Sequence, residues 1–95
     1  MPALWIAHVK VNDAEAYARY AAGATEAIAA HGGVFVARGG AYLQLEGPER
    51  PRNVVARFPS MEAAEACYRS DAYQAALSHA KGAAERELVL VEIPD

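Results

Sequence analysis

Cysteine and clustered positive charge are nearly absent from this chain. Cys67 is its one cysteine, which excludes an internal disulfide, and no Cys/His spacing matches a zinc site, so we expect no bound metal. The nine Lys and Arg residues are scattered along the sequence, and the formal net charge is -3. A nucleic-acid surface needs a basic stripe that neutralises phosphates, and we therefore expect no nucleic-acid partner.

Long apolar runs and nucleotide-binding glycine loops are also missing. No apolar run approaches the length of a membrane span and no signal peptide is recognisable, so we expect a cytoplasmic protein with no membrane partner. The pair Gly32-Gly33 follows an expected helix and precedes an expected strand, which reverses the order that a phosphate-binding loop requires. We expect the protein to use no cofactor.

Apolar residues are abundant, at 54% of the chain, but alanine supplies many of them and buries little area per residue. Ninety-five residues predict a single domain, residues 1–95. A domain of this size buries only roughly 60 to 65% of the surface of its unfolded chain. Packing against a second copy would compensate for so small a core.

The periodicity predicts an α+β fold. We expect strands at 4–11, 34–38, 53–58 and 86–93, a helix that begins at Asp13 after an Asn12 cap and ends near His31, and a second helix from Ser60 that restarts at Ser70. Residues 42–46 are expected to continue the second strand. This order is the ferredoxin-like βαββαβ pattern, a four-stranded antiparallel sheet with its helices on one face.

Glycines occur at two informative places in this pattern. We expect Gly39 and Gly40 to need positive φ at a kink after the second strand, because glycine pairs often mark such sites. Gly23 lies in the interior of the first expected helix, where alanine should be a better helix former.

The sheet face opposite the helices is expected to be apolar and uncovered. Its expected members are Leu4, Ile6, Val34, Val36, Leu88 and Leu90. An exposed patch of this kind usually marks an interface. We therefore predict a homodimer in which two sheets pack face to face.

Four polar side chains interrupt the otherwise apolar strands: His8, Arg38, Arg57 and Glu92. Gathered around one cavity, they could hold an organic acid and move a proton. The alternative is that they form ion pairs or lie at solvated strand ends. Arg38 is our first choice as a ligand contact, because it ends a strand beside glycines and its planar fork suits a carboxylate.

Tyrosines on the helices supply further candidates. Tyr17, Tyr68 and Tyr73, together with Tyr20, could wall a pocket between helices and sheet, where their hydroxyls would orient a ligand. Alternatively they are core-edge residues whose hydroxyls reach water, which is our interpretation of Tyr20. Cys67 is interpreted as a small apolar helix residue rather than a nucleophile.

Several short motifs together resemble a known bacterial family, domain of unknown function 1330. They are Tyr17 with Tyr20, Gly32-Gly33 running to Arg38-Gly39-Gly40, Leu45-Glu46-Gly47, Phe58-Pro59-Ser60, the run from Tyr68 to Gln74, and Val91-Glu92. The resemblance covers nearly the whole chain and implies a dimeric α/β barrel of two ferredoxin-like subunits. It also implies kinship with small antibiotic-biosynthesis-type monooxygenases and muconolactone isomerase-like proteins.

Two departures from the family pattern stand out. Cys67 replaces a usual tryptophan, and the stretch from Ala80 to Gly82 lacks a usual arginine. The composition, the apolar sheet face, the candidate site residues and the family resemblance together predict a cytoplasmic homodimer with a small-molecule pocket. The chemistry that the resemblance implies for such a pocket is cofactor-free isomerisation or monooxygenation of an organic acid. A non-catalytic ligand-binding or regulatory module is the alternative.

Overall fold

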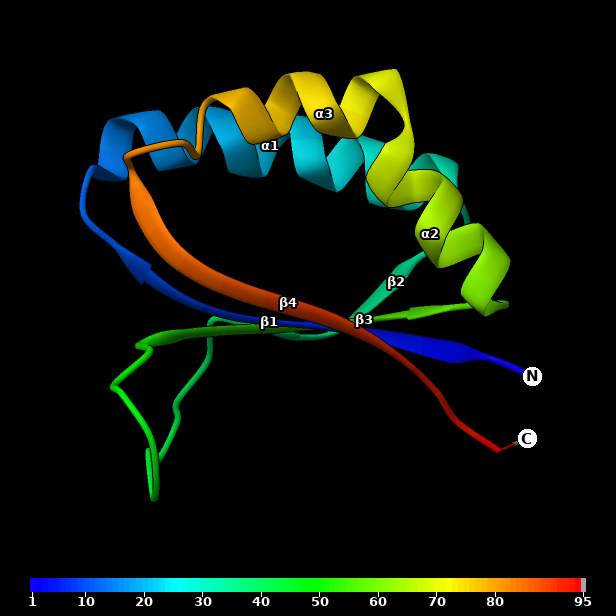
Figure 1. The fold of residues 1–95 in the computed structure, drawn as a ribbon, viewed down its shortest axis with the longest axis horizontal. Coiled ribbons are helices and arrows are strands. Elements are labelled where there is room, and N and C mark those ends of the chain that lie inside the picture. Colours follow the sequence, from blue (N-terminus) through cyan, green and yellow to red (C-terminus); the bar gives the residue numbers. More distant parts are fainter. Residues whose placement is uncertain (95) are drawn as a thin grey trace.

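The computed structural model describes residues 1–94 and confirms the α+β, ferredoxin-like prediction (Figure 1). The strands are β1 (Ala3–Val11), β2 (Val34–Arg38), β3 (Arg52–Phe58) and β4 (Ala84–Glu92). The helices are α1 (Ala14–Ala30), α2 (Met61–Arg69) and α3 (Asp71–Ser78). The strands form one antiparallel sheet in the order β2-β3-β1-β4, and all the helices lie on one of its faces.

Helix α1 begins one residue later than predicted. The side chain of Asp13, not Asn12, caps it by accepting a hydrogen bond from the backbone N of Ala16 at 3.1 Å. Just before the helix, the backbone N atoms of Asn12 and Asp13 both donate to the carbonyl of Ala83, at 2.7 and 3.0 Å. The start of α1 is thus tied to the start of β4.

The predicted break in the second helical segment is confirmed at Ser70. Its hydroxyl oxygen accepts from the backbone N of Tyr73 at 3.1 Å and so caps α3, while its own backbone N donates to the carbonyl of Cys67 at the end of α2. Ser60 caps α2 in the same way, through the backbone N of Ala63. A serine cap therefore marks the start of each of these two helices.

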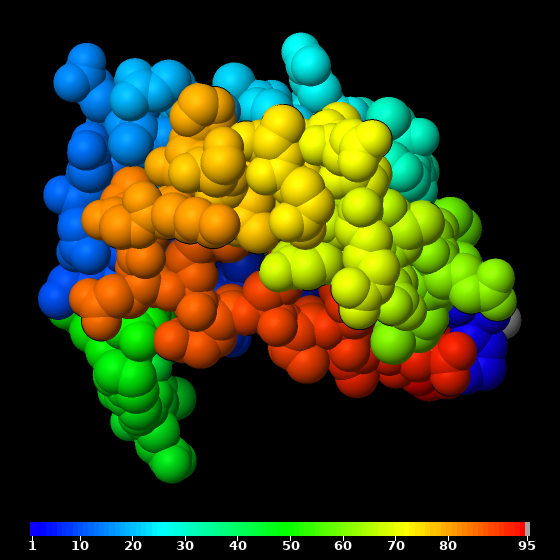
Figure 2. All heavy atoms as spheres, turned by 45° about the horizontal axis from the view of Figure 1, so that its top comes forward, coloured from blue at the N-terminus to red at the C-terminus, as the bar shows by residue number. Residues whose placement is uncertain are grey.

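Residues 42–46 do not form the strand that we expected. Pairing between β2 and β3 ends where the Gly39 backbone N donates to the carbonyl of Asn53 at 2.9 Å, and Gly39 then turns the chain with a φ of 69°. Gly40 has no positive φ, so only half of the glycine pair behaves as predicted. Residues 40–51 leave the sheet as an irregular projection, which we call the arm (Figure 2).

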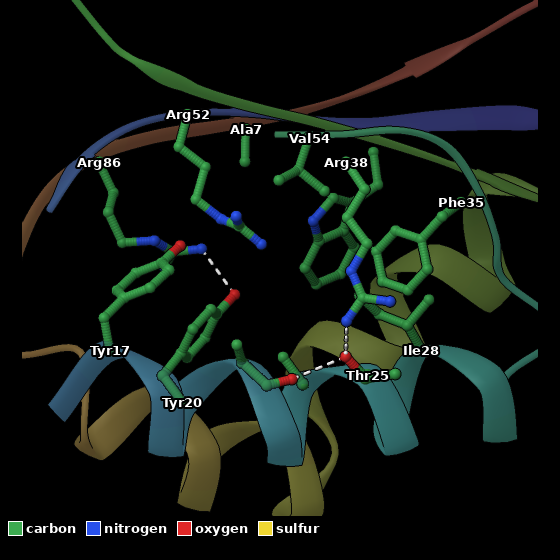
Figure 3. Close-up of a pocket in the computed structure, with 13 residues that line it drawn as sticks. Ala7, Tyr17, Tyr20, Thr25, Ile28, Phe35, Arg38, Arg52, Val54 and Arg86 are labelled. Atoms are coloured by element: carbon green, nitrogen blue, oxygen red, sulfur yellow. Dashed lines mark hydrogen bonds between the residues drawn. The ribbon is translucent and has the colours of Figure 1, made fainter. Parts of the chain in front are cut away.

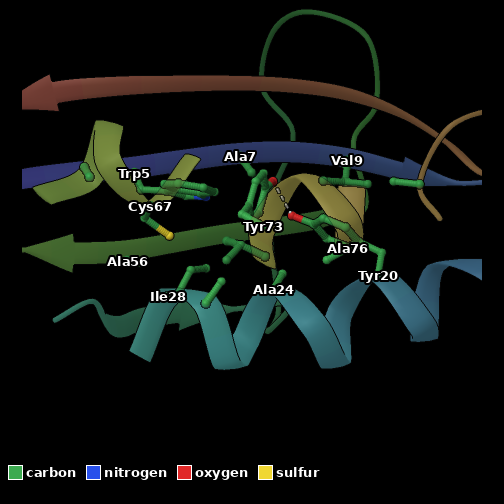
Figure 4. Packing of buried hydrophobic residues seen from close by; sticks show 14 of the residues in the cluster. Trp5, Ala7, Val9, Tyr20, Ala24, Ile28, Ala56, Cys67, Tyr73 and Ala76 are labelled. Carbon is green, nitrogen blue, oxygen red and sulfur yellow. Dashed lines mark hydrogen bonds between the residues drawn. The ribbon is translucent and has the colours of Figure 1, made fainter. Parts of the chain in front are cut away.

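The core lies between the sheet and the helices and is strongly aromatic (Figure 4). Trp5 is almost fully buried and meets the ring of Tyr73 edge-on, with centroids 5.0 Å apart. Helices α1 and α3 approach each other closely at Gly23. A Cβ added to this glycine would lie 2.8 Å from the Cβ of Ala76. Gly23 is therefore a packing glycine, and the expectation that alanine suits this position is wrong.

The opposite, open face of the sheet is apolar, but not with all of the expected members. Leu90 pairs with Trp5 in the register, so it shares the helix-facing side, and Leu88 lies beside it on that side. Val89 and Val91 take their place on the open face and are 54% and 43% exposed. The error was one of strand parity, since a shift of one residue exchanges the two faces.

Strand β2 contains a β-bulge at Val36. Phe35 pairs with Ala56 and Ala37 with Val55, so the residue between them is extra. The extra residue reverses the alternation, and Arg38 therefore pairs with Val54 and points to the helix side, as Phe35 does. Without the bulge, Arg38 would project from the open face.

Within residues 1–94, no helix is long and apolar enough to cross a membrane.

Candidate functional site

A pocket lies between α1 and the helix-facing side of the sheet (Figure 3). Its walls are largely aromatic or aliphatic, and they include Trp5, Ala24, Ile28 and Phe35. The enclosed cavity is only about 30 Å³, room for no more than two or three waters. A larger ligand fits only if some of the long side chains that reach into the pocket from the sheet shift.

Those long side chains are arginines from three different strands. Arg38 comes from β2, Arg52 from β3 and Arg86 from β4, and all three extend toward α1 (Figure 3). Arg52 and Arg86 both pair with Val9 of β1, on its two sides, so their Cα atoms lie about 10 Å apart, two strand spacings. The strand register therefore brings separate parts of the chain to one pocket.

Each arginine lies over an aromatic ring. The guanidinium carbon of Arg38 is 4.3 Å from the ring centroid of Phe35, and that of Arg86 is 4.6 Å from the Tyr20 centroid. Arg52 is more loosely placed, 5.9 Å from the Tyr17 centroid. Stacking on a π face orients a guanidinium while leaving its N–H edge free to donate.

The inner end of the pocket carries a hydrogen-bonded pair of buried tyrosines. The Tyr20 and Tyr73 hydroxyls are 2.7 Å apart, and Nη2 of Arg86 donates to the Tyr20 hydroxyl at 2.7 Å. Burial raises the pKa of Tyr20 above its ordinary value, and the neighbouring Tyr73 raises it further. Burial raises the pKa of Tyr73 as well. Both phenols therefore keep their protons at neutral pH. The burial of Tyr20 contradicts our expectation that its hydroxyl reaches water.

At the outer end, Arg38 is exposed and donates through Nη2 to the hydroxyl of Thr25 on α1. That hydroxyl in turn donates to the carbonyl of Ala21 at 2.7 Å. Helix α1 thus holds one arginine near each end of the pocket, Arg86 through Tyr20 and Arg38 through Thr25.

Positive charge in this pocket has no acidic counterpart. The residues that line it, all within 1–94, include three arginines and no aspartate, glutamate or histidine. The Nε atoms of Arg52 and Arg86 are buried and have no hydrogen-bond partner among residues 1–94. An unsatisfied buried donor costs about 1 to 3 kcal/mol, so a hydrogen-bond acceptor placed beside these atoms would be stabilising.

Of the predicted site residues, the structure brings Tyr17 and Arg38 together as lining residues of this pocket. Tyr73 contributes behind them through its hydrogen bond to Tyr20. Tyr68 packs against Tyr73 with ring centroids 5.3 Å apart, but it lines a separate groove between α2 and β4.

The remaining predicted residues lie elsewhere. Arg57 pairs with Leu4 on the open face and is exposed, and Glu92 is exposed at the end of β4. His8 is also exposed, and its Nδ1 lies 2.6 Å from Oδ1 of Asn53. The constellation of His8, Arg38, Arg57 and Glu92 around one cavity is therefore not formed, and any ligand contact by the residues outside the pocket stays a prediction.

His8 does line a second cavity, of about 230 Å³, between the sheet and the arm. This cavity is closed at one side by Arg50 of the arm, whose Nε and Nη2 both donate to the Glu87 carboxylate at 2.9 Å. The same hydrogen bonds lower the pKa of Glu87. Here the charges are paired, and the ion pair has an evident structural role in holding the arm to β4.

Sequence reasoning missed Arg52, Arg86 and Thr25. Strand parity contained the signal for the two arginines. Arg52 lies two residues before Val54 and Arg86 two residues before Leu88, so each arginine shares the helix-facing side of its strand with that residue. Cys67 behaves as predicted: it is buried in the core, and burial raises the pKa of its thiol to about 11, so it is no nucleophile at neutral pH.

Comparison with protein families matches residues 2–94 to the family described as Domain of unknown function (DUF1330). No curated protein matches the chain. Among solved structures, RPA0582, a protein of unknown function from Rhodopseudomonas palustris, is 25% identical, with a TM-score of 0.79 over 99% of this chain and 83% of that one.

Two more distant structures share the fold. SnoaB, a cofactor-independent oxygenase from Streptomyces nogalater, is 14% identical with a TM-score of 0.67, covering 99% of this chain and 94% of that one. A dimeric ferredoxin-like protein of unknown function from Thermobifida fusca is 21% identical with a TM-score of 0.65, covering 98% and 92%.

Proposed function

We propose, given that this chain belongs to the family described as Domain of unknown function (DUF1330), that it binds a small organic acid between α1 and the sheet. The ligand has an apolar body, which the aromatic and aliphatic walls cover, and a carboxylate, which the arginines hold. One observation carries the proposal: Arg38, Arg52 and Arg86 line one pocket in which no acidic side chain balances them.

Arginine is well suited to this task. Its fork can hold a carboxylate through two parallel hydrogen bonds, and such charge-assisted bonds are about twice as strong as neutral ones. The unpartnered Nε atoms of Arg52 and Arg86 each offer the edge of the fork that a carboxylate approaches. Binding would relieve both the unsatisfied donors and the repulsion among the cations.

The donors in this pocket favour binding and polarisation over proton abstraction. None of the lining residues is a carboxylate or an imidazole, and burial keeps the pKa of Tyr20 and of Tyr73 raised, so these two phenols keep their protons. The pocket therefore has no side-chain base for an isomerisation, and a ligand-binding module is the function that its geometry supports best.

Cofactor-free oxygenation is a second candidate. The cations can stabilise a substrate that is itself acidic at carbon, so that its carbanion, without a protein base, reacts with dioxygen and a CH₂ group becomes a carbonyl with release of water. SnoaB has the same fold and is described as a cofactor-independent oxygenase. Dioxygen uptake with a bound acid would favour this candidate over a binding module.

A homodimer is part of the proposal. The open face exposes Val34, Val36 and Val89 by 66%, 65% and 54%, which is unusual for strand valines in contact with water. A second copy packed sheet to sheet would cover them, and the structural relative from Thermobifida fusca is described as dimeric. The cytoplasmic location expected from the sequence belongs to the same proposal.

Arg52→Met tests the binding site. We expect small aromatic and aliphatic carboxylates, screened by thermal shift and confirmed by calorimetry, to stabilise the unaltered protein. The variant should bind such a hit about tenfold or more weakly, because it loses a charge-assisted hydrogen bond. Its own melting temperature should stay level or rise, since the change removes an unpartnered buried donor.

Arg19→Met is the matched control, because Arg19 is exposed on α1 and does not line the pocket. It should bind the same hit unchanged. Equal affinities in the two variants would remove the pocket from consideration, and a screen in which no carboxylate stabilises the unaltered protein would end the proposal.

A further inference from the structure

We infer that the ligand of this pocket is a dianion, a small acid with one anionic group at each end of an apolar spacer. The inference rests on the proposed function and narrows it to a substrate class. It comes from the way the pocket distributes its cations, which are divided between two anchoring points on α1.

The cations at the two ends of the pocket, Arg86 at the inner end and Arg38 at the outer end, are fixed apart. Arg86 is pinned by its hydrogen bond to Tyr20, and Arg38 by its hydrogen bond to Thr25 (Figure 3). Tyr20 and Thr25 are five residues apart in α1, which corresponds to about 7.5 Å along the helix axis. The two arginines also start from β2 and β4, which are three strand spacings or about 14 Å apart in the sheet, so they do not converge on one carboxylate while they keep these partners.

Arg52 reinforces the inner end. It flanks Val9 opposite Arg86, so the two arginines face each other across one strand, and both have a buried, unpartnered Nε. A carboxylate placed between them would satisfy both atoms. Arg38, exposed at the mouth, would then remain without an anion unless the ligand carries a second one.

The lining between the two ends is apolar, which defines the spacer. Ala21 and Ala24 of α1 and Val54 of β3 line this part of the pocket and offer no side-chain hydrogen bond. A polar spacer would lose its hydration here without compensation. The chemical class is thus a short dicarboxylate, or a carboxylate with a second acidic oxygen, joined by hydrocarbon.

The test compares each diacid with its own monomethyl ester. A panel of linear diacids from succinate to suberate, together with terephthalate, is measured by calorimetry on the unaltered protein. We expect at least one diacid to bind about tenfold or more tightly than its monoester, because the ester removes one charge while keeping shape and spacer. This comparison needs no variant and so does not depend on the folding of one.

Arg38→Met then locates the second charge. The variant should bind the diacid and the monoester with similar affinity, while Arg19→Met keeps the difference. A monoester that binds the unaltered protein as tightly as its diacid would overturn the dianion inference but leave the proposed acid site standing. If neither diacids nor monoacids bind, both fail.

Discussion

Tyr20 joins the pocket to the core. Its ring lines the pocket under Arg86, while its hydroxyl reaches the fully buried Tyr73. The pair of phenols supplies the acceptors that hold Arg86 in place, so a polar network extends into a core that is otherwise apolar. A network of this kind stabilises the fold only while each member keeps its partners.

The stability of the protein should fall in alkali because of this pair. Burial raises the folded-state pKa of both phenols, so their contribution is complete below about pH 10, the ordinary tyrosine pKa, and is lost as the pH rises further. Above that pH the unfolded chain releases these protons while the folded chain retains them. Stability must therefore decline with pH in this range.

Tyr20→Phe should make this alkaline decline shallower, although it lowers stability by about 1 to 2 kcal/mol at neutral pH through the lost hydrogen bonds. Urea unfolding at a series of pH values measures both effects. Tyr17→Phe is the control, since Tyr17 lines the same pocket outside the Tyr20–Tyr73 pair. An alkaline slope that Tyr20→Phe leaves unchanged would contradict the burial of this phenol.

Gly23 gives a second test at the residue scale. Gly23→Ala should destabilise the protein and lower its melting temperature by several degrees, because the new Cβ would stand 2.8 Å from that of Ala76 and push α1 from α3. Helix propensity alone favours alanine by about 1 kcal/mol, so the sign of the change decides which effect dominates. Gly40→Ala, which adds a methyl group in open space, should be neutral.

At the scale of elements, the β2 bulge decides which side of the sheet receives Arg38. Removal of Val36 should close the bulge and leave Arg38 paired with Val54 on the helix-facing side, because the shortened strand still pairs Phe35 with Ala56 and Ala37 with Val55. We expect the deletion variant to keep a folded far-ultraviolet spectrum and to bind the acid about as tightly as the unaltered protein, whereas Arg38→Met should weaken binding about tenfold. Val36→Ala keeps the strand length and should also bind normally. A folded deletion variant that binds the acid as weakly as Arg38→Met would contradict this account of the register.

Sequence reasoning placed β2 correctly and the ends of most other elements within two residues, because apolar periodicity and serine or aspartate caps act locally. It failed where distant segments meet. No local pattern shows that Ala76 lies against Gly23, that Val36 is an extra residue in its ladder, or that residues 42–46 have no strand to pair with.

The residues of the candidate site also divide into those that local sequence indicates and those that depend on contacts between distant segments. Tyr17 and Arg38 were predicted from residue type and position, but the face reached by Arg38 depends on a bulge that the sequence does not reveal. Strand parity could have identified Arg52 and Arg86, but the expected third strand began at residue 53, after Arg52, and Arg86 stood at the start of the expected fourth strand, where arginine is usually solvated.

For the molecule as a whole, the open face sets the expected assembly. Val89→Asp should dissociate the proposed dimer, because Val89 pairs with Ile6 near the middle of this face and a charge there would be buried without a partner. Light scattering should give a mass near twice 10.1 kDa for the unaltered protein and a lower mass for the variant. Ala22→Asp, on the exposed surface of α1, should stay dimeric.

A monomeric mass for the unaltered protein at micromolar concentration would show that the valines of the open face serve another purpose. The acid site lies on the other side of the sheet, within one chain, so this result would not affect it. Assembly and binding can therefore be tested separately.

The position of Trp5 gives the protein a built-in optical reporter. It is the one tryptophan of the chain, it is 1% exposed, and its ring borders the pocket while it touches Tyr73. Its fluorescence should be blue-shifted in the folded state, and an occupant of the pocket should change its intensity without any attached dye. Tyrosines packed nearby would transfer excitation to it, so light absorbed by much of the aromatic core would emerge from a single indole beside the ligand.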